Sequence, residues 1–170
     1  MQQEAWLSGP LKNVSPILMP AAHALIQSAR DIEQATEKLN ETEVWAKPCG
    51  APSVGFHLLH IAGSCDRLLT YARGEKLSEK QFATLNDERE INLSMSANLL
   101  TENAVASIQK VIGEISLTPD EILFETREVG RKKIQTNVFG LLFHIAEHTQ
   151  RHVGQIIATA KIVRSRDLKN

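Results

Sequence analysis

The sequence predicts an all-α protein with the architecture of a four-helix bundle. Four segments carry apolar residues at three- and four-residue spacing, which is the pattern of amphipathic helices. Proline and glycine lie mainly between these segments, as they do at helix ends. The chain has 170 residues, 42% of them hydrophobic, and shows no repeat or flexible linker, so we expect one domain over residues 1–170.

The charge and cysteine content argue against several classes of protein. Nineteen Lys and Arg residues against twenty Asp and Glu give a formal net charge of -1, which disfavours nucleic-acid binding. Two cysteines outside any CxxC motif indicate a reducing environment. The N-terminus has no basic segment followed by an apolar stretch, and no apolar run approaches the roughly 20 residues of a membrane span. We therefore expect a cytoplasmic protein without a membrane partner.

The first two long helices are predicted from apolar spacing and from the residues at their ends. The first runs from Pro20 to about Asn40, and the second runs from about Val54 to Arg73. Ser53 is a suitable N-cap for the second helix because its hydroxyl can accept a hydrogen bond from a backbone N–H of the first turn. Gly74 is expected to end that helix.

A short helix and a third long helix are expected next. Ser78 and Gln81 have the spacing of a capping box, which predicts a short helix in the segment LSEKQFATL. The third long helix is expected within Glu88–Ile115, where Asn and Ser residues blur its start. Its apolar positions are Leu99, Val105, Ile108, Ile112 and Ile115.

The connection between the third and fourth long helices is predicted to be a long crossover. Thr118-Pro119-Asp120 breaks the helical pattern, and two short extended runs then flank Val129-Gly130-Arg131, which predicts a small hairpin. Thr136 is the expected cap of the last helix, which runs from about Asn137 to Arg164.

The last helix contains three histidines at i, i+4 steps, namely His144, His148 and His152. Such residues project toward one side of a helix. His148 and His152 straddle the apolar stripe that should face the core, whereas His144 lies at its margin. Two imidazoles in an apolar stripe need partners for their ring nitrogens, and a shared metal ion would serve both. The alternative is a pair of capped or solvent-reaching histidines.

The second helix offers a third metal ligand in His60. The face around His60 combines Arg67, Tyr71, Phe56 and Ser64, a mixture that suits the wall of a pocket. A solvated amphipathic surface is the alternative interpretation. A competing ligand, His57, lies nearer the apolar arc of the same helix.

Two segments carry a resemblance to a known family. PSVGFHLLHIAGSCDRLLTYARGE, followed far downstream by VFGLLFHIAEHTQRHVGQII, resembles the DinB/YfiT-like family over nearly the whole chain. The resemblance implies a four-helix bundle and a divalent metal held by His60, His148 and His152. In the family, the position that matches His144 is often histidine but usually not a ligand. Many relatives have arginine after the last histidine, where this chain has Val153, so no role is assigned to that position.

A site of three neutral imidazoles leaves at least one coordination position open, as catalytic metal sites do. Zn, Ni, Fe or Mn would all accept such ligands. The family implies metal-dependent transferases and isomerases that use low-molecular-weight thiols, such as bacillithiol S-transferases and a mycothiol-dependent isomerase. We therefore expect a thiol S-transferase or isomerase, or a hydrolase that uses metal-activated water, acting on a small molecule. The alternatives are a non-catalytic metal- or ligand-binding stress-response module and a stress-response protein that acts on DNA, which the net charge disfavours.

Two residues on the His60 face are candidate catalytic residues. Arg67 is predicted to bind a substrate carboxylate, and Tyr71 is predicted to act as a hydrogen-bond donor or proton shuttle. A surface arginine and a rim tyrosine are the alternative. Glu147 points away from the histidine face and is not proposed as a base. Cys49 and Cys65 are interpreted as a loop thiol and a core residue.

The last helix carries a second apolar strip on its other side. A helix that is apolar on both sides either lies centrally in its own bundle or packs against a partner. Small side chains in the strip would let another helix approach closely, so we expect a homodimer built partly on this face. The strip consists of Leu142, Phe143, Ala146, Val153, Gly154 and Ile157.

Overall fold

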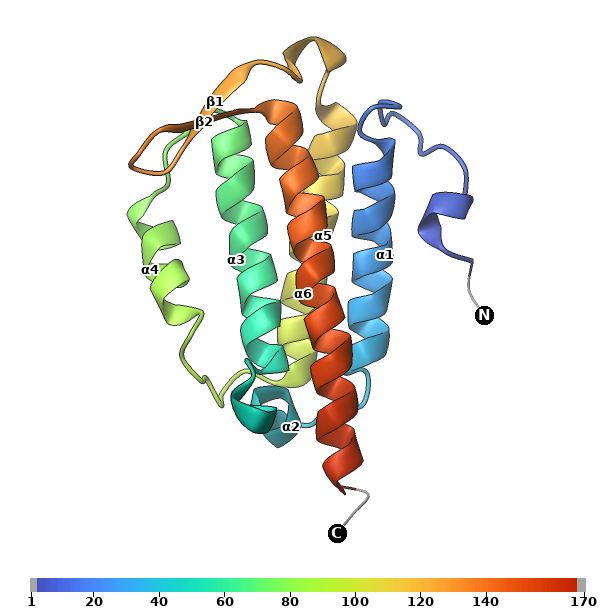
Figure 1. Ribbon diagram of the computed structural model, residues 1–170, viewed down its shortest axis with the longest axis vertical. Coiled ribbons are helices and arrows are strands. Elements are labelled where there is room, and N and C mark those ends of the chain that lie inside the picture. The colour runs from blue at the N-terminus through green and yellow to red at the C-terminus, as the bar shows by residue number, and fades with distance from the viewer. Residues whose placement is uncertain (1–2, 168–170) are drawn as a thin grey trace.

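The computed structural model of the protein describes residues 3–167 and confirms the predicted fold class (Figure 1). Residues 1, 2 and 168–170, which the single-domain prediction included, lie outside the described residues. Four long helices surround one hydrophobic core. They are α1 (Met19–Thr36), α3 (Val54–Ala72), α5 (Ala97–Leu117) and α6 (Val138–Asp167).

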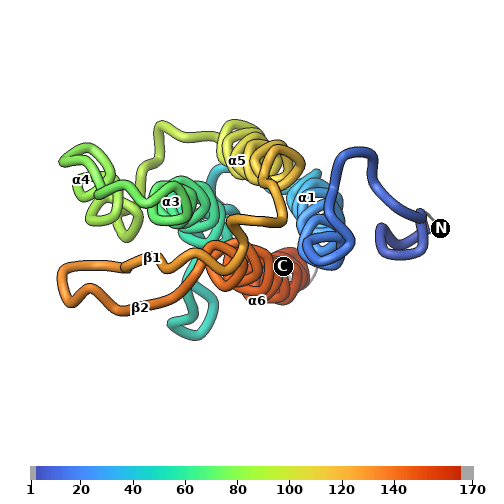
Figure 2. The backbone as a smooth tube through the Cα atoms, turned by 90° about the horizontal axis from the view of Figure 1, so that it is seen from above, coloured from blue at the N-terminus to red at the C-terminus, as the bar shows by residue number. Residues whose placement is uncertain are grey.

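The four long helices form a square in which α1 and α3 occupy opposite corners (Figure 2). Helices α5 and α6 occupy the other two corners, so each of them packs against both α1 and α3. The colour gradient in Figure 1 shows that α3 and α5 run in one direction and that α1 and α6 run in the other. The packed pair α3 and α6 is therefore antiparallel, which sets the first half of α3 against the middle of α6.

The predicted helix ends are confirmed at three positions. Ser53 begins α3, with its Oγ accepting a hydrogen bond from the Phe56 N–H at 3.1 Å. Ser78 and Gln81 form the predicted capping box of α4 (Glu79–Asp87). Gly74 follows α3 with a φ of 78°, a left-handed conformation that favours glycine at the end of a helix.

The first helix is shorter than predicted because a second helix begins where it was expected to end. Helix α1 ends at Thr36, and Asn40 starts the short helix α2 (Glu41–Trp45). The Asn40 side chain accepts a hydrogen bond from the Glu43 N–H at 2.9 Å, and the Glu43 carboxylate accepts one from the Asn40 N–H at 2.8 Å. This reciprocal cap was visible in the sequence as an Asn-x-x-Glu spacing. A 3-10 turn at Pro48–Gly50 then leads into α3.

The third long helix begins later than predicted. Glu88 lies at the C-terminal end of α4, and α5 starts only at Ala97. Within α5 the predicted core residue Leu99 is 43% exposed, while its neighbour Leu100 is buried. The predicted core positions Val105, Ile108 and Ile115 are buried, and Ile112 is partly buried.

The predicted hairpin is present between α5 and α6. A short 3-10 turn at Asp120–Ile122 precedes strands β1 (Thr126–Val129) and β2 (Ile134–Asn137), which pair antiparallel. The predicted cap of α6 is wrong by one residue. The side chain of Asn137, and not that of Thr136, accepts a hydrogen bond from the Gly140 N–H, at 2.7 Å.

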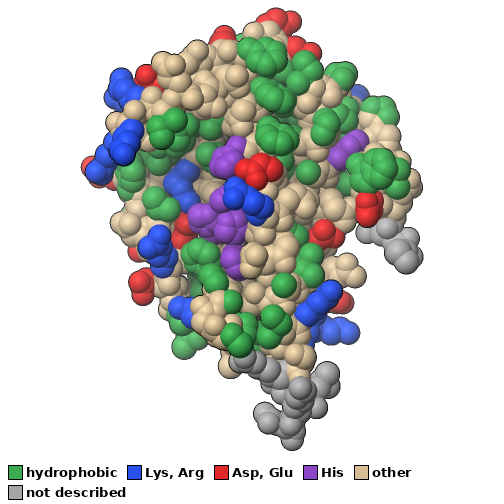
Figure 3. All heavy atoms as spheres, viewed as in Figure 1, with side chains coloured by type: hydrophobic (Ala, Val, Ile, Leu, Met, Phe, Trp, Pro, Cys, Tyr) green, Lys and Arg blue, Asp and Glu red, His purple; other side chains and the backbone are tan. Residues whose placement is uncertain are grey.

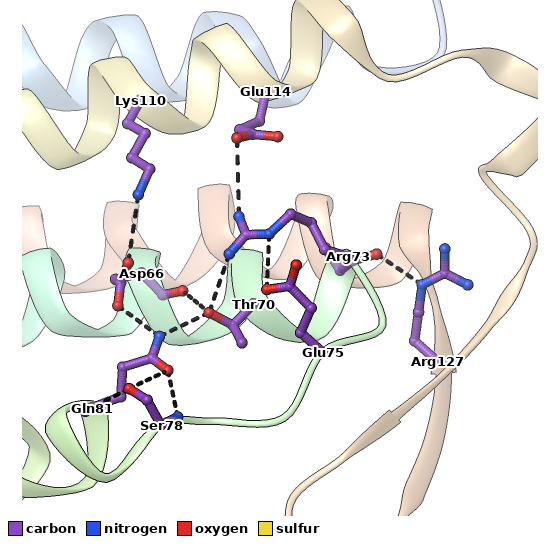
Figure 4. Close-up of polar contacts among 10 residues, drawn as sticks. Asp66, Thr70, Arg73, Glu75, Ser78, Gln81, Lys110, Glu114 and Arg127 are labelled. Atoms are coloured by element: carbon purple, nitrogen blue, oxygen red, sulfur yellow. Dashed lines mark hydrogen bonds and ion pairs between the residues drawn. The ribbon is translucent and has the colours of Figure 1, made fainter.

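Polar contacts hold α4 and the hairpin against α3 (Figure 4). No residue of α4 is buried, so apolar burial does little to fix this helix in place. Instead the Gln81 amide donates to Asp66 Oδ2 at 2.7 Å and to Thr70 Oγ1 at 2.8 Å. On the hairpin, Arg127 Nε donates to the Ala72 carbonyl at 2.7 Å. These contacts set the position from which the far end of α4 reaches the middle of α3.

The second apolar strip of the last helix lies largely inside the bundle. Leu142, Ala146 and Val153 are buried in the core, because α6 packs against both α1 and α3. Phe143 and Gly154 remain exposed. The buried part of the strip thus belongs to the contacts of α6 with its two neighbours in the bundle. Among the described residues, none of the helices combines the length and the apolar character needed to cross a membrane.

The core position Ile145 provides a test of the packing. We expect Ile145→Ala to lower the free energy of unfolding by about 2–5 kcal/mol, because it removes apolar volume from a side chain that is only 1% exposed. Denaturant unfolding would measure the change. Ile162→Ala is the matched control on the same helix, since Ile162 is 46% exposed and should change stability by less than about 1 kcal/mol. Equal losses in the two variants would contradict the described burial.

Candidate metal centre

Antiparallel packing of α3 and α6 brings together the three histidines predicted to bind a metal. His60 from α3 faces His148 and His152 from α6, and one ring nitrogen of each lies within 4.8 Å of the other two. His60 Nε2 and His148 Nε2 are 3.0 Å apart. The His152 ring centroid lies 4.6 Å from that of His60 and 4.5 Å from that of His148. The predicted ligand set is therefore one cluster in space.

The cluster lies at the junction of α3 and α6 and reaches the surface on one side. All three side chains are partly buried. The His60 side chain is 22% exposed, and the Phe56 ring stacks on its imidazole at a centroid distance of 5.6 Å. Figure 3 shows histidine side chains gathered on this face beside basic and acidic groups. A small molecule can reach the cluster from solvent.

The two clustered histidines on α6, His148 and His152, are neutral at physiological pH. Burial, followed by electrostatic repulsion from the nearby His60, lowers the pKa of His148 from 6.5 to about 4. Burial and the charge of His60 also lower the pKa of His152, to about 3. Neutral imidazole has an unprotonated ring nitrogen that can bind a metal ion.

His57 lies behind the cluster and contacts only one of its members. His57 Nδ1 and His152 Nδ1 are 2.8 Å apart. The side chain is buried, and among the described residues its Nε2 has no hydrogen-bond partner. Burial, followed by the charge of His60, lowers the pKa of His57 to about 4. His57 is thus a neutral neighbour that orients His152, and it does not join the three clustered nitrogens.

A buried carboxylate, which the sequence analysis missed, contacts His60. His60 Nδ1 lies 2.8 Å from Glu88 Oε2. Glu88 is 3% exposed and also accepts hydrogen bonds from Arg67, at 2.5 Å from Nη1 and 3.3 Å from Nη2. Glu88 lies in the irregular segment after α4, where no helical periodicity singles out any residue. The mixture of small and polar residues on the His60 face of α3 was the sequence signal that could have indicated such a partner, because the Glu88 carboxylate packs against this face.

On the solvent side, His148 contacts a group of charged residues on its own helix. Arg151 Nη2 lies 3.2 Å from His148 Nδ1, and Arg151 Nε donates to Glu147 Oε2 at 2.9 Å. Glu147 Oε1 also lies 2.6 Å from Nδ1 of the exposed His144. Glu147 is thus paired with residues of the helix surface, away from the three clustered nitrogens, as the sequence indicated.

The two predicted catalytic residues lie apart from the clustered nitrogens. Arg67 is buried and binds a carboxylate of the protein itself, that of Glu88. Tyr71 is eleven residues beyond His60, which corresponds to about 16 Å along a helix. It lines a pocket between the end of α3, α4 and the hairpin, together with Phe82 and Arg131. Substrate roles for Arg67 and Tyr71 stay predictions.

The remaining histidine and the cysteines have positions that suit structural roles. His23 is buried on α1, and its Nε2 lies 3.0 Å from the carbonyl oxygen of Gly9, which holds the N-terminal segment against the bundle. Cys65 is buried in the core, and burial raises the pKa of its thiol to about 12. Cys49 is exposed in the turn before α3.

Comparison with known proteins identifies the family. A family model described as the DinB superfamily matches residues 24–156. The chain belongs to the DinB superfamily. A solved structure of YfiT from Bacillus subtilis, described as a probable metal-dependent hydrolase with an unusual four-helix bundle topology, shares the fold with a TM-score of 0.58. The two chains are 16% identical over 90% of this chain and 91% of that one. No curated protein matches the chain.

The donor atoms of this DinB-superfamily site fit a divalent transition metal. Two nitrogens that each bind one tetrahedral zinc at 2.0–2.1 Å are about 3.3 Å apart. The observed 3.0 Å between His60 Nε2 and His148 Nε2 is close to that value. The third nitrogen, from His152, lies within 4.8 Å of the other two. The neutral state of the α6 histidines removes proton competition at those two positions.

The lowered pKa values predict how the stability of the metal-free protein depends on pH. On unfolding, His148 and His152 regain the ordinary pKa of 6.5, whereas in the folded protein they stay neutral down to about pH 4. Between these values the unfolded chain binds more protons, so stability falls as the pH drops from 6.5 to about 4. Thermal unfolding in the presence of a chelator would measure this loss.

A double variant, His148→Gln with His152→Gln, is the control for this pH dependence. Carboxylates contribute equally to both proteins, so the difference between wild type and variant isolates the two histidines. We expect the wild type to lose more stability than the variant over this pH range. If the stability of the two proteins fell by the same amount over this pH range, the lowered pKa values of His148 and His152 would be contradicted.

Proposed function

We propose that the protein is a divalent-metal-dependent enzyme that acts on a small molecule. The observation that carries the proposal is the convergence of His60, His148 and His152 at a site that reaches solvent. Three neutral ligands from rigid helices leave coordination positions for a substrate, whereas structural sites are closed by four protein ligands. Zn, Ni, Fe and Mn are the candidate metals.

Each group around the site has a proposed task. His60, His148 and His152 would hold the metal, which supplies a Lewis acid that favours the ionised form of a bound thiol or water. Phe56, stacked on His60, covers one side of the site with an apolar ring. His57 orients His152 from behind through their Nδ1 atoms. The protein therefore provides fixed ligands and a partly apolar wall, and the reacting groups come from the substrates.

Thiol transfer or isomerisation with a low-molecular-weight thiol is the first candidate reaction. It requires no nucleophile from the protein, and the Cys65 thiol lies in the core and not at the cluster. Hydrolysis by metal-activated water is the second candidate, and the description of YfiT as a probable metal-dependent hydrolase favours it. A non-catalytic metal- or ligand-binding module is the remaining alternative.

The positions of Arg67 and Tyr71 restrict the substrate contacts that we propose for them. Arg67 could bind a substrate carboxylate in addition to Glu88 only with donor atoms that Glu88 leaves available. Tyr71 could contact only a distant part of an extended substrate. The contacts support a different role for Arg67, which is to hold Glu88.

Metal content tests the central claim. The protein purified without added metal or a His tag, then reconstituted with Zn, Ni, Fe or Mn, should hold a single divalent ion per chain. His60→Ala and His148→Ala should each weaken metal binding by at least about 100-fold, because each removes a direct ligand. Elemental analysis and titration would measure both. His144→Ala is the matched control on the same helix face and should keep the metal.

The same preparations separate the candidate reactions. Turnover of a thiol with an electrophile supports transfer, and metal-dependent cleavage of ester or amide substrates supports hydrolysis. Bound metal with turnover in neither assay would favour the binding module. A wild-type protein that holds no metal after reconstitution would contradict the proposal as a whole.

The proposed assembly is a homodimer in the cytoplasm, without a nucleic-acid or membrane partner. The exposed part of α6 that could meet a second copy includes Phe143, whose ring lies 6.2 Å from that of Phe139. Phe139 in turn lies 6.1 Å from the exposed Phe124. These three aromatic rings form a continuous apolar ridge.

Light scattering at micromolar concentration should give twice the chain mass. Phe143→Glu should shift the protein to the monomer, because it places a charge in the ridge, whereas Ile162→Glu lower on the same helix should not. A monomeric wild type would contradict the homodimer.

A further inference from the structure

We propose that Glu88 is a positioning residue that fixes the tautomer of His60 and so aims its Nε2 lone pair at the metal. The inference rests on the proposed metal site and adds a residue from outside the two helices that carry the ligands. Glu88 reaches His60 from the end of α4, a contact that spans 28 positions of the chain.

The geometry at Glu88 determines where His60 carries its proton. An ionised carboxylate can only accept hydrogen bonds. Glu88 Oε2 lies 2.8 Å from His60 Nδ1, so Nδ1 must be the donor. A neutral imidazole has one N–H, which leaves Nε2 unprotonated. This is the nitrogen that faces His148, and it is therefore ready to bind a metal.

Contacts at the opposite end of the cluster agree with the same tautomer. A guanidinium can only donate, so the contact of 3.2 Å from Arg151 Nη2 makes His148 Nδ1 an acceptor. The proton of His148 then lies on Nε2, which is 3.0 Å from His60 Nε2. His60 Nε2 must accept this proton's hydrogen bond. When a metal binds, His60 keeps its tautomer, whereas His148 has to move its proton to Nδ1.

The surroundings of Glu88 hold the carboxylate in this place. Arg67 contacts both of its oxygens, which compensates a charge that would be costly to bury alone. Position 63 is glycine, and a Cβ there would overlap Glu88 Oε1 and lie 2.6 Å from Arg67 Nη1. The absence of a side chain at Gly63 is thus what lets the carboxylate and the guanidinium meet against α3.

This arrangement matches a recurrent feature of metal sites. Histidine ligands commonly donate their second N–H to a carboxylate, which fixes the ring and raises its basicity, and loss of that carboxylate weakens metal binding by about 10–100-fold. If the ion pair between Glu88 and Arg67 were purely structural, loss of the carboxylate would affect stability but would leave the tautomer of His60 unchanged. The tautomer therefore distinguishes the two roles.

The tautomer of His60 can be measured by long-range ¹H–¹⁵N NMR on metal-free protein with ¹⁵N-labelled histidine. The signals of His60 are assigned as those that disappear in the His60→Gln variant. We expect the wild-type proton on Nδ1. In Glu88→Gln, Arg67 takes the carboxamide oxygen because it can only donate, so the amide NH₂ turns toward His60. That variant should move the His60 proton to Nε2 and should bind zinc about 10–100-fold more weakly in chelator competition.

Glu90→Gln is the matched control, since Glu90 is exposed two residues further along the same segment. It should leave both the tautomer and the zinc affinity unchanged. A wild-type His60 with its proton on Nε2 would overturn the proposal. A Glu88→Gln protein with the same zinc affinity as Glu90→Gln would overturn it as well. A wild type that fails to bind zinc would refute the metal site. The NMR measurement would still decide the role of Glu88, because the tautomer is measured on metal-free protein.

Discussion

The antiparallel contact between α3 and α6 is the constraint on which the rest of the structure depends. It sets His60 opposite His148 and His152, while α6 packs against α1 on its other side. The connection between α3 and α5 belongs to the same arrangement. Because α3 and α5 run in the same direction, the chain has to return along the bundle between them, and α4 lies on that return path. The candidate site receives its buried carboxylate from that connection.

The three clustered histidines share one site but have different outer partners. His60 contacts the buried carboxylate of Glu88, His152 contacts the buried imidazole of His57, and His148 contacts the exposed guanidinium of Arg151. Only the first of these partners is negatively charged and enclosed by protein. The partner of His148 is a long surface side chain that can move. The candidate site therefore combines one histidine held in advance with others that can adjust, which suits the proposed metal centre with an outer face open to solvent.

Local patterns predicted the long helices, the hairpin and the His148/His152 pair, because apolar spacing, turn residues and i, i+4 steps are properties of a single segment. The choice of His60 over His57 also rested on the family resemblance. Local patterns could not identify Glu88, because its role depends on a contact with His60, which lies 28 positions away in the chain. They also suggested a face of α3 open to substrate, where the structure shows Arg67 paired within the protein. The boundary near Asn40 was missed because apolar residues continue beyond Thr36, although the capping box was present in the sequence.

The space at Gly63 has a consequence for how this site can change over evolutionary time. Any side chain at that position displaces the carboxylate or the guanidinium beside it. Loss of Arg67 alone would leave an uncompensated buried charge at Glu88, and loss of Glu88 alone would leave one at Arg67. We therefore expect the three positions to change together. A larger residue at position 63 would displace the ion pair, and His60 would then need another acceptor for its Nδ1 proton.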